Sequence, residues 1–153
     1  YNEEDRPESG DIYKMVIGRT IKICSVSSMI KKSVLEKLGY YDEDLAYEDL
    51  DLWIRTSRDF EFEYIPEILA KKRIVSDSLS SHFLIENNAR AKKLNESTLK
   101  ILVKAYHLNK TKDEHKALLG RIRFEMYKFI KAKHFKLLFK LFLLEIKARL
   151  KSI

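Results

Sequence analysis

The densest group of chemically active side chains is a cluster of carboxylates in one short stretch. It comprises Asp42, Glu43, Asp44, Glu48, Asp49 and Asp51. A carboxylate held at the start of a helix can accept a proton from a substrate hydroxyl while that hydroxyl attacks another molecule. Asp49 is the candidate for such a general base. An unperturbed aspartate is ionised at neutral pH and is a weak base, so its position beside the reacting oxygen would matter most.

The same cluster also fits a purely structural role. Carboxylates near a helix start interact favourably with the positive end of the helix dipole, and Glu48 or Asp49 could cap a helix. Residue types alone favour this second interpretation, a solvated acidic turn. The elements on either side of the cluster are therefore the next guide to its role.

The elements before the cluster are predicted from their residue types. Residues 20–30 are rich in β-branched and small side chains with partial alternation, which favours a strand. Ser33 and Glu36 have the spacing of a capping box at the start of a short helix over 33–38, and Gly39 suits a left-handed residue after its end. Cys24, within an apolar run, is expected to be a buried thiol in a reducing compartment.

The elements after the cluster divide into a mixed part and a helical part. Residues 48–58 are predicted to form a helix that turns Leu52 and Trp53 inward and pairs Asp51 with Arg55 on its surface. The other predicted elements are a short helix over 11–17, strands over 62–65 and 67–74, and helices over about 82–107, 112–133 and 135–151. The change in composition predicts a boundary near residue 80, giving units 1–80 and 81–153.

Residues 20–80 resemble the later half of the catalytic domain of family-2 inverting glycosyltransferases. In that family a strand leads to a helix ending at Gly, followed by an aromatic-Asp-Glu phrase and then by Glu-Asp-x-Asp-Leu-x-x-Arg. This chain has Tyr41-Asp42-Glu43, and then Glu48-Asp49-Leu50-Asp51-Leu52. The resemblance implies an α/β fold, the C-terminal, acceptor-side part of a GT-A (Rossmann-like) nucleotide-diphospho-sugar transferase domain, followed by a helical tail.

The resemblance also implies roles for single residues. Asp49 matches the family's general base, which deprotonates the acceptor hydroxyl for displacement with inversion at the anomeric carbon. Glu48 and Tyr47 would contact a glycan or lipid-linked acceptor. Arg73 matches a recurrent arginine near the donor phosphates or inside the fold, and Arg55 matches a position that looks structural.

Two features depart from the family pattern. Val75 stands where the family usually has a histidine, and His82, seven residues on, could replace it only if the turn folds back. The half that binds the nucleotide-sugar, with Mg²⁺ or Mn²⁺ on an Asp-x-Asp motif, has no counterpart here. The Asp-x-Asp matches at 42–44 and 49–51 follow the short helix, not a donor-site strand, so no metal is expected on this chain. Because the chain begins at Tyr1, we expect a segment of a longer enzyme that is inactive alone.

The C-terminal segment contains most of the positive charge. Residues 121–153 have a balance of +8, whereas the chain as a whole has +7, so the first 120 residues are slightly acidic. On a helical projection, five lysines fall in one narrow stripe: Lys133, Lys136, Lys140, Lys147 and Lys151. The remainder of that projection is largely apolar, with phenylalanine and leucine the commonest residues.

Two interpretations of the tail stay open. It is either a core helix with its lysines in water, or a helix lying in a membrane interface with its lysines on anionic lipid. It is too often interrupted by charge to span a bilayer. Nucleic acid is not expected as a partner, because aromatic and basic residues do not interleave on one surface.

The sequence therefore predicts a cytoplasmic protein, and the membrane interpretation of the tail adds peripheral attachment at the inner membrane face. The leading hypothesis is a glycosyltransferase fragment. The alternative is a non-catalytic interaction or membrane-attachment module derived from the same fold, and Val75 is its main support.

Overall fold

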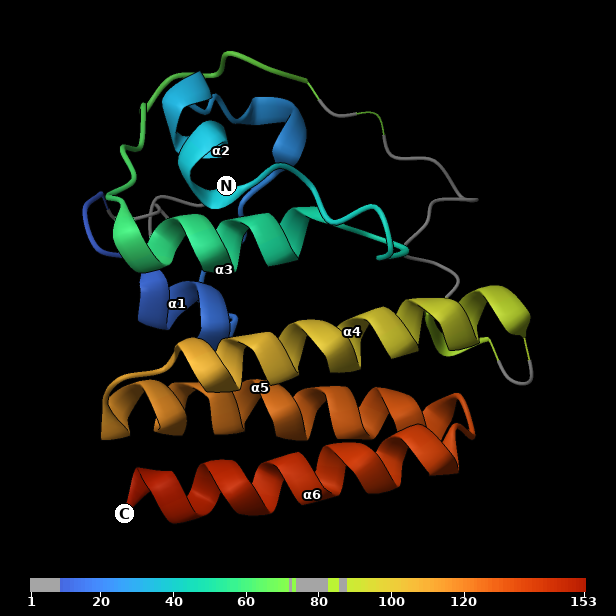
Figure 1. The fold of residues 1–153 in the computed structure, drawn as a ribbon. Coiled ribbons are helices and arrows are strands. Elements are labelled where there is room, and N and C mark those ends of the chain that lie inside the picture. Colours follow the sequence, from blue (N-terminus) through green and yellow to red (C-terminus); the bar gives the residue numbers. More distant parts are fainter. Residues whose placement is uncertain (1–8, 72, 74–82, 86–87) are drawn as a thin grey trace.

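The computed structural model describes residues 9–71, 73, 83–85 and 88–153, and every regular element among them is a helix (Figure 1). The elements are α1 (Tyr13–Gly18), the short 3-10 helix η2 (Ser25–Ser27), α2 (Lys32–Leu38), α3 (Asp49–Asp59), α4 (Ala89–Leu108), α5 (Lys112–Lys131) and α6 (Phe135–Ser152). The expected helices over 11–17, 33–38 and 48–58 and the three long C-terminal helices are all present, with shifted ends.

The three long helices stack side by side in an up-and-down arrangement, with α1, α3 and α2 above them (Figure 1). A capped helix start and a tight turn support this stacking of the three helices. The Asn88 side chain accepts hydrogen bonds from the backbone of Arg90 and Ala91 at the start of α4. Between α5 and α6, Lys133 adopts a positive φ of 57°, which reverses the chain within a few residues.

The capping box predicted at Ser33 and Glu36 is wrong. Helix α2 begins one residue earlier, at Lys32, so Ser33 already lies inside the first turn and makes no cap hydrogen bond. The motif forms instead at the start of α5, where the Thr111 side chain accepts from the backbone of Glu114 and the Glu114 carboxylate accepts from the backbone of Thr111.

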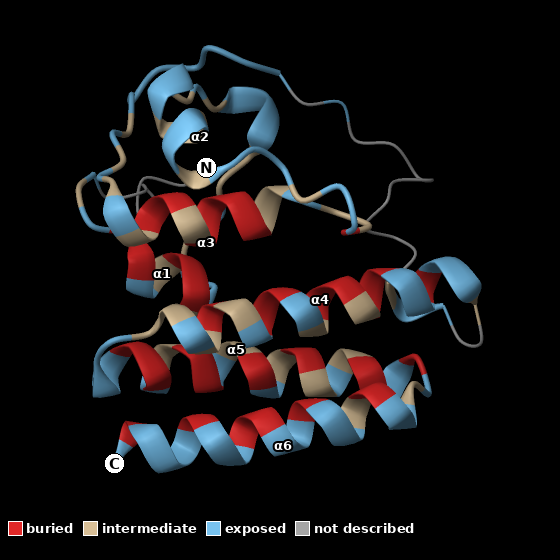
Figure 2. Cartoon of the chain, viewed as in Figure 1, coloured by how far each residue is buried: buried red, intermediate tan, exposed pale blue. Residues whose placement is uncertain are grey.

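The apolar core is continuous from the first helix to the last. Buried side chains face one another between the helices, whereas the outer face of α6 is exposed (Figure 2). Tyr13, Leu52, Ile101, Ile122 and Leu141 are all fully buried in this one cluster. The core thus includes residues from both sides of position 80, and the predicted division of the chain there stays a prediction.

A charged junction ties α1, α3 and α5 together. Arg58 on α3 pairs with Glu114 on α5 at 2.7 Å, and its guanidinium lies 4.0 Å from the centre of the Tyr13 ring on α1. The Tyr13 hydroxyl donates to Asn109 in the turn after α4, at 2.8 Å. Burial raises the pKa of Tyr13 to about 12, so this hydroxyl remains a donor at physiological pH.

The predicted α/β, GT-A (Rossmann-like) fold is wrong for the chain that the structure describes. No β-strand occurs in residues 20–30, 62–65 or the described part of 67–74, and the extended pairing there is a single bridge between Gly10 and Phe62. Residue types that favour strands do so by packing on a neighbouring strand, and among the described residues no strand lies beside these segments.

Serine side chains add a local reason for the missing strand at 20–30. The hydroxyls of Ser27 and Ser28 both donate to the Cys24 carbonyl, at 3.1 and 2.7 Å. These bonds close a turn, which forms η2 in the middle of the expected strand. Serine competes in this way with regular backbone pairing, so the β-branched neighbours do not decide the conformation.

Among the described helices, none combines the length and the apolar composition that crossing a bilayer requires.

Replacing Ile122 by Ala is expected to lower the free energy of unfolding by about 2–5 kcal/mol, because the change leaves a cavity in the core between the helices. The matched control on the same helix is Ile130→Ala, whose side chain is 52% exposed and whose loss should cost about 0.5 kcal/mol or less. Urea denaturation measures both, and equal losses would contradict the assigned core.

The protein is expected to lose stability as the pH falls below about 6.5. Burial, with Lys151 nearby, lowers the pKa of His115, and burial, with Lys92 nearby, lowers that of His134. The unfolded chain therefore binds protons more readily than the folded chain over this range. Urea denaturation at pH 7.5 and 5.5 should show a smaller difference in the free energy of unfolding for His115→Gln than for wild type, and an equal difference would contradict the role assigned to His115.

Candidate active site

The acidic turn at residues 40–48 is fastened to α4. The backbone amide of Ala46 donates to the Ser97 hydroxyl at 2.8 Å, and the Tyr47 and Thr98 hydroxyls lie 2.7 Å apart. The ring of Tyr47 also meets the edge of Phe83, with centroids 5.4 Å apart. Burial raises the pKa of Tyr47 above its ordinary value. The turn is therefore a fixed part of the fold, although it contains few apolar residues.

Lys104 of α4 forms ion pairs with two carboxylates of the cluster. Its Nζ lies 2.6 Å from Asp42 Oδ2 and 2.9 Å from Asp51 Oδ1. The hydrogen bond from Lys104 lowers the pKa of Asp42. Burial acts to lower the pKa of Lys104, but the bonds to Asp42 and Asp51 raise it overall. Asp42 and Lys104 are accordingly charged at neutral pH, and the bonds from Lys104 to Asp42 and Asp51 hold the turn against the start of α3.

Arg55 completes this support from α3. It pairs with Asp51 at 2.8 Å, the pair predicted from their spacing of four residues, and Asp51 itself is only 2% exposed. The same guanidinium donates to the carbonyls of Leu38 at 2.9 Å and of Tyr40 at 2.8 Å. These carbonyls follow the end of α2, where Gly39 has a φ of +82° that side chains rarely adopt. Arg55 thus joins α2, the turn and α3.

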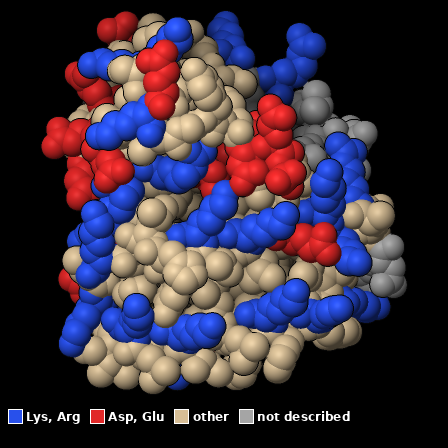
Figure 3. Space-filling view, viewed as in Figure 1, with Lys and Arg blue, Asp and Glu red and all other residues tan. Residues whose placement is uncertain are grey.

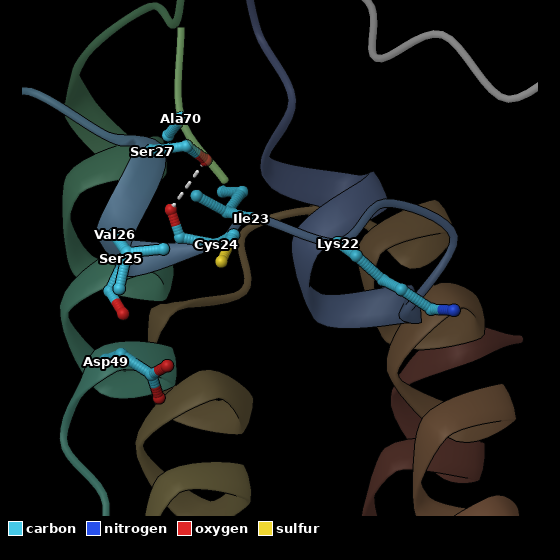
Figure 4. A pocket seen from close by; sticks show the side chains of 8 residues that line it. All are labelled: Lys22, Ile23, Cys24, Ser25, Val26, Ser27, Asp49 and Ala70. Carbon is cyan, nitrogen blue, oxygen red and sulfur yellow. Dashed lines mark hydrogen bonds between the residues drawn. The ribbon is translucent and has the colours of Figure 1, made fainter. Parts of the chain in front are cut away.

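Asp49 is the acid of the cluster that lines a pocket. It is the first residue of α3, half-buried, and lies below Ser25 and Val26 in the close-up of the pocket (Figure 4). The pocket is open, has a volume of about 390 Å³, and is otherwise lined by residues 22–27 and Ala70. Its volume lies in the range of small-ligand sites. Cys24, predicted to be buried, is instead half-exposed at this pocket.

The structure separates the six acids into three groups. Asp42 and Asp51 are engaged by Lys104, and Asp51 also by Arg55. Glu43, Asp44 and Glu48 are exposed to solvent. Asp49 alone among the six lines the pocket, and its Oδ1 accepts a hydrogen bond of 2.7 Å from the Leu50 amide, which fixes the carboxylate at the helix start.

The remaining predicted site residues lie at different depths. Tyr47 is packed against α4, and Glu48 is exposed at the N-cap position of α3 without a cap hydrogen bond. Arg73 is exposed after the described extended segment. The acceptor and donor contacts expected of these residues stay predictions. Val75 and His82 lie outside the described residues.

Arg121 of α5 is a charged neighbour of the site that the sequence did not indicate. Its side chain is 12% exposed and pairs with Glu125 at 3.6 Å. Burial lowers the pKa of Arg121, and the charges of Glu125, Tyr47 and Asp49 act in the opposite direction. A helix from the C-terminal half therefore places a positive charge near Asp49. In the sequence, the four-residue spacing of Arg121 and Glu125 predicts only an ion pair within α5.

The described residues do not fit a divalent cation site. Among them, no group of three or more His, Cys, Asp or Glu side chains is arranged to hold a metal ion. Within the acidic cluster, Lys104 already occupies the oxygens of Asp42 and Asp51 that such a cation would need. The Mg²⁺ or Mn²⁺ implied by the resemblance therefore has no part in the chemistry assigned to these residues.

The tail lysines take two kinds of position. Lys136, Lys140, Lys147 and Lys151 are exposed along α6, whereas Lys133 lies in the turn before this helix. Figure 3 shows acidic side chains gathered in the upper part of the molecule and rows of basic side chains over the lower helices. The charge asymmetry predicted from the sequence thus becomes an asymmetry between two regions of the surface.

The comparison with known proteins gives one partial match. A curated relative, an uncharacterised glycosyltransferase of Methanocaldococcus jannaschii, is 41% identical over 49 residues. Part of this chain is related to a glycosyltransferase. The matched residues are 31% of the chain and 17% of that protein, so the match spans only a small part of the relative. No protein-family model and no solved structure matches the chain.

Replacing Lys104 by Met is expected to lower the free energy of unfolding by about 1.5–3 kcal/mol, since charged hydrogen bonds to Asp42 and to the buried Asp51 are lost. Met keeps most of the aliphatic length, so the change tests the charge. The control is Lys93→Met on the exposed side of the same helix. Urea denaturation measures the free energy of unfolding of both variants. Equal values would show that the ion pairs of Lys104 do not support the turn.

Proposed function

We propose that this chain forms the acceptor side of an inverting, family-2-like glycosyltransferase, with Asp49 as the general base. In this proposal a nucleotide-sugar donor is bound by residues outside these 153. The acceptor, a glycan or lipid-linked sugar, enters the pocket in front of Asp49. The supporting observation is that Asp49, alone of the six acids, lines the pocket and is fixed there by the Leu50 amide.

The proposed reaction is a single displacement. An acceptor hydroxyl attacks the anomeric carbon of the donor sugar, and its proton passes to a carboxylate oxygen of Asp49. The new bond joins the acceptor oxygen to the anomeric carbon, while the bond from that carbon to the diphosphate breaks. The nucleoside diphosphate leaves with the electron pair, and attack from the opposite side inverts the configuration.

Neighbouring residues have supporting roles in this proposal. The Lys104 and Arg55 network holds the turn, so that the start of α3 stays beside the pocket. Arg121 contributes a positive charge near Asp49 from the C-terminal half of the chain. Glu48, exposed next to Asp49, would accept hydrogen bonds from other hydroxyls of the acceptor. Tyr47, packed against α4, would form part of the acceptor-binding surface. Arg73 would lie towards the donor.

Two features support this proposal jointly. The partial match to a glycosyltransferase gives the reaction class in its coarsest form. The phrase Tyr47-Glu48-Asp49, which carries the family resemblance, coincides with the acid that lines the pocket.

Replacing Asp49 by Asn in the full-length protein should lower kcat for sugar transfer by about 10²–10⁴-fold, with a smaller change in KM, because the base is lost while the shape is kept. Asn retains an oxygen for the Leu50 amide, so the fold should not change. Release of nucleoside diphosphate from a panel of nucleotide-sugars, with and without acceptor glycans, measures the reaction.

The matched control is Asp44→Asn, which removes an exposed acid from the same cluster and should leave kcat unchanged. Activity of Asp49→Asn equal to wild type would remove Asp49 as the base. A wild-type protein that turns over no nucleotide-sugar would favour the alternative, an interaction or membrane-attachment module without catalysis.

A further inference from the structure

The outer face of α6 exposes large apolar side chains that the described elements leave uncovered. Its members are Phe135, Phe139, Phe142, Leu143, Ile146 and Leu150, followed by Ile153 at the end of the chain. Phe139 is 63% exposed and Leu150 is 71% exposed. We call these seven residues the α6 apolar face. Scattered exposed apolar residues are ordinary, but a contiguous row along a helix marks an interaction surface.

Helical geometry separates this face from the core. At 100° per residue, its six helical members fall within an arc of about 100°. The buried residues Leu137, Leu141, Leu144 and Ala148 lie on the opposite side of α6, against α4 and α5. The helix therefore has two apolar faces, and packing within the described chain uses only one of them (Figure 2).

Positive charge borders the α6 apolar face on both sides. The exposed lysines of one border are Lys136, Lys140, Lys147 and Lys151. The other border has Arg149 and, from α5, Arg123, which both pair with Glu145. Glu145 is the single acid of α6 and is itself buried. Figure 3 shows basic side chains in a row over the lower part of the molecule, with uncharged surface below them.

We propose that the α6 apolar face lies in the interface of a membrane rich in anionic lipid. In that position the phenylalanine and leucine side chains enter the boundary of the acyl chains, and the cations on both borders meet lipid phosphates. At 1.5 Å per residue, the 18 residues of α6 would lie flat over about 27 Å of membrane surface. The helix keeps its packing on α4 and α5 throughout.

A shallow groove gives the lysine border a place for a lipid headgroup. It has a volume of about 210 Å³ and lies between α4 and α6. Lys140 and Lys147 line it together with Tyr106 and Leu143, so two cations stand over an apolar floor. This combination suits a phosphate attached to hydrocarbon, which needs charge at one end and apolar surface at the other.

A second copy of the chain is a poorer occupant for the same face. Two α6 faces placed together would bring both cationic borders into one interface, and like charges held close repel. Glu145, the acid nearest these borders, is already paired with Arg123 and Arg149. An anionic membrane, in contrast, is complementary in both charge and polarity.

The experiment is co-sedimentation of the full-length protein with vesicles of phosphatidylcholine, with and without phosphatidylglycerol, at low and high salt. Binding is expected to anionic vesicles and to weaken as salt screens the charges. Phe139→Glu with Leu150→Glu should lower the partition coefficient at least tenfold. Lys140→Gln with Lys147→Gln should lower it about fivefold per lysine. Circular dichroism and thermal unfolding check that each variant folds.

Matched controls keep the test specific. Met29→Glu places a new acid at a side chain that is 92% exposed and remote from α6, and Lys14→Gln with Lys93→Gln removes two exposed lysines elsewhere. Neither should change vesicle binding. Failure of the folded wild type to bind anionic vesicles at low salt would overturn the proposal. So would a dimer in sedimentation that Phe139→Glu dissociates without any change in vesicle binding. Sugar transfer does not enter this test, so its outcome is independent of the function proposed for Asp49.

Discussion

The ion pair between Lys104 and Asp51 is the interaction on which the arrangement around Asp49 depends. Asp51 is almost completely buried, so its charge requires partners, and Lys104 from α4 and Arg55 from α3 provide them. Lys104 also pairs with Asp42, and Arg55 also donates to the carbonyl of Leu38 at the end of α2. A buried carboxylate raises the free energy of the folded state unless its charge is paired and hydrogen-bonded. Moving α4 or the turn away from α3 would separate Asp51 from its partners, so these segments keep one arrangement.

Helix α5 extends this constraint to the C-terminal half. Its Glu114 forms an ion pair with Arg58 of α3, and its Arg121 contributes a positive charge near Asp49. Helices α1 and α5 are also in contact at Gly18, where an added Cβ would meet the Ala117 side chain at 3.4 Å, an ordinary van der Waals distance. The candidate site is thus supported by residues of α4 and α5, Lys104, Glu114 and Arg121, that follow Asp49 by more than fifty residues in the sequence.

Helical periodicity was the most reliable guide in this sequence, and β-propensity the least. The long apolar repeats after residue 88, and the inward positions of Leu52 and Trp53, correspond to buried helix faces because such faces pack wherever another helix is available. The strand expected at 20–30 depended on a neighbouring strand and on serines that bond their own backbone instead. Asp49 is predicted from its place at a helix start in the acidic cluster and from the family resemblance, whereas its neighbour Arg121 approaches through tertiary packing that no local spacing encodes.

The packing of α1 on α5 has a consequence for synthesis of the chain. These helices are separated by about 100 residues, so the apolar side of α1 emerges from the ribosome long before its partner exists. At about 5–20 residues per second, Ile12, Val16 and Ile17 would wait roughly 5–20 s for α5. During that interval the nascent chain presents an unburied apolar surface, which makes it a natural client for chaperones that bind polypeptides during translation.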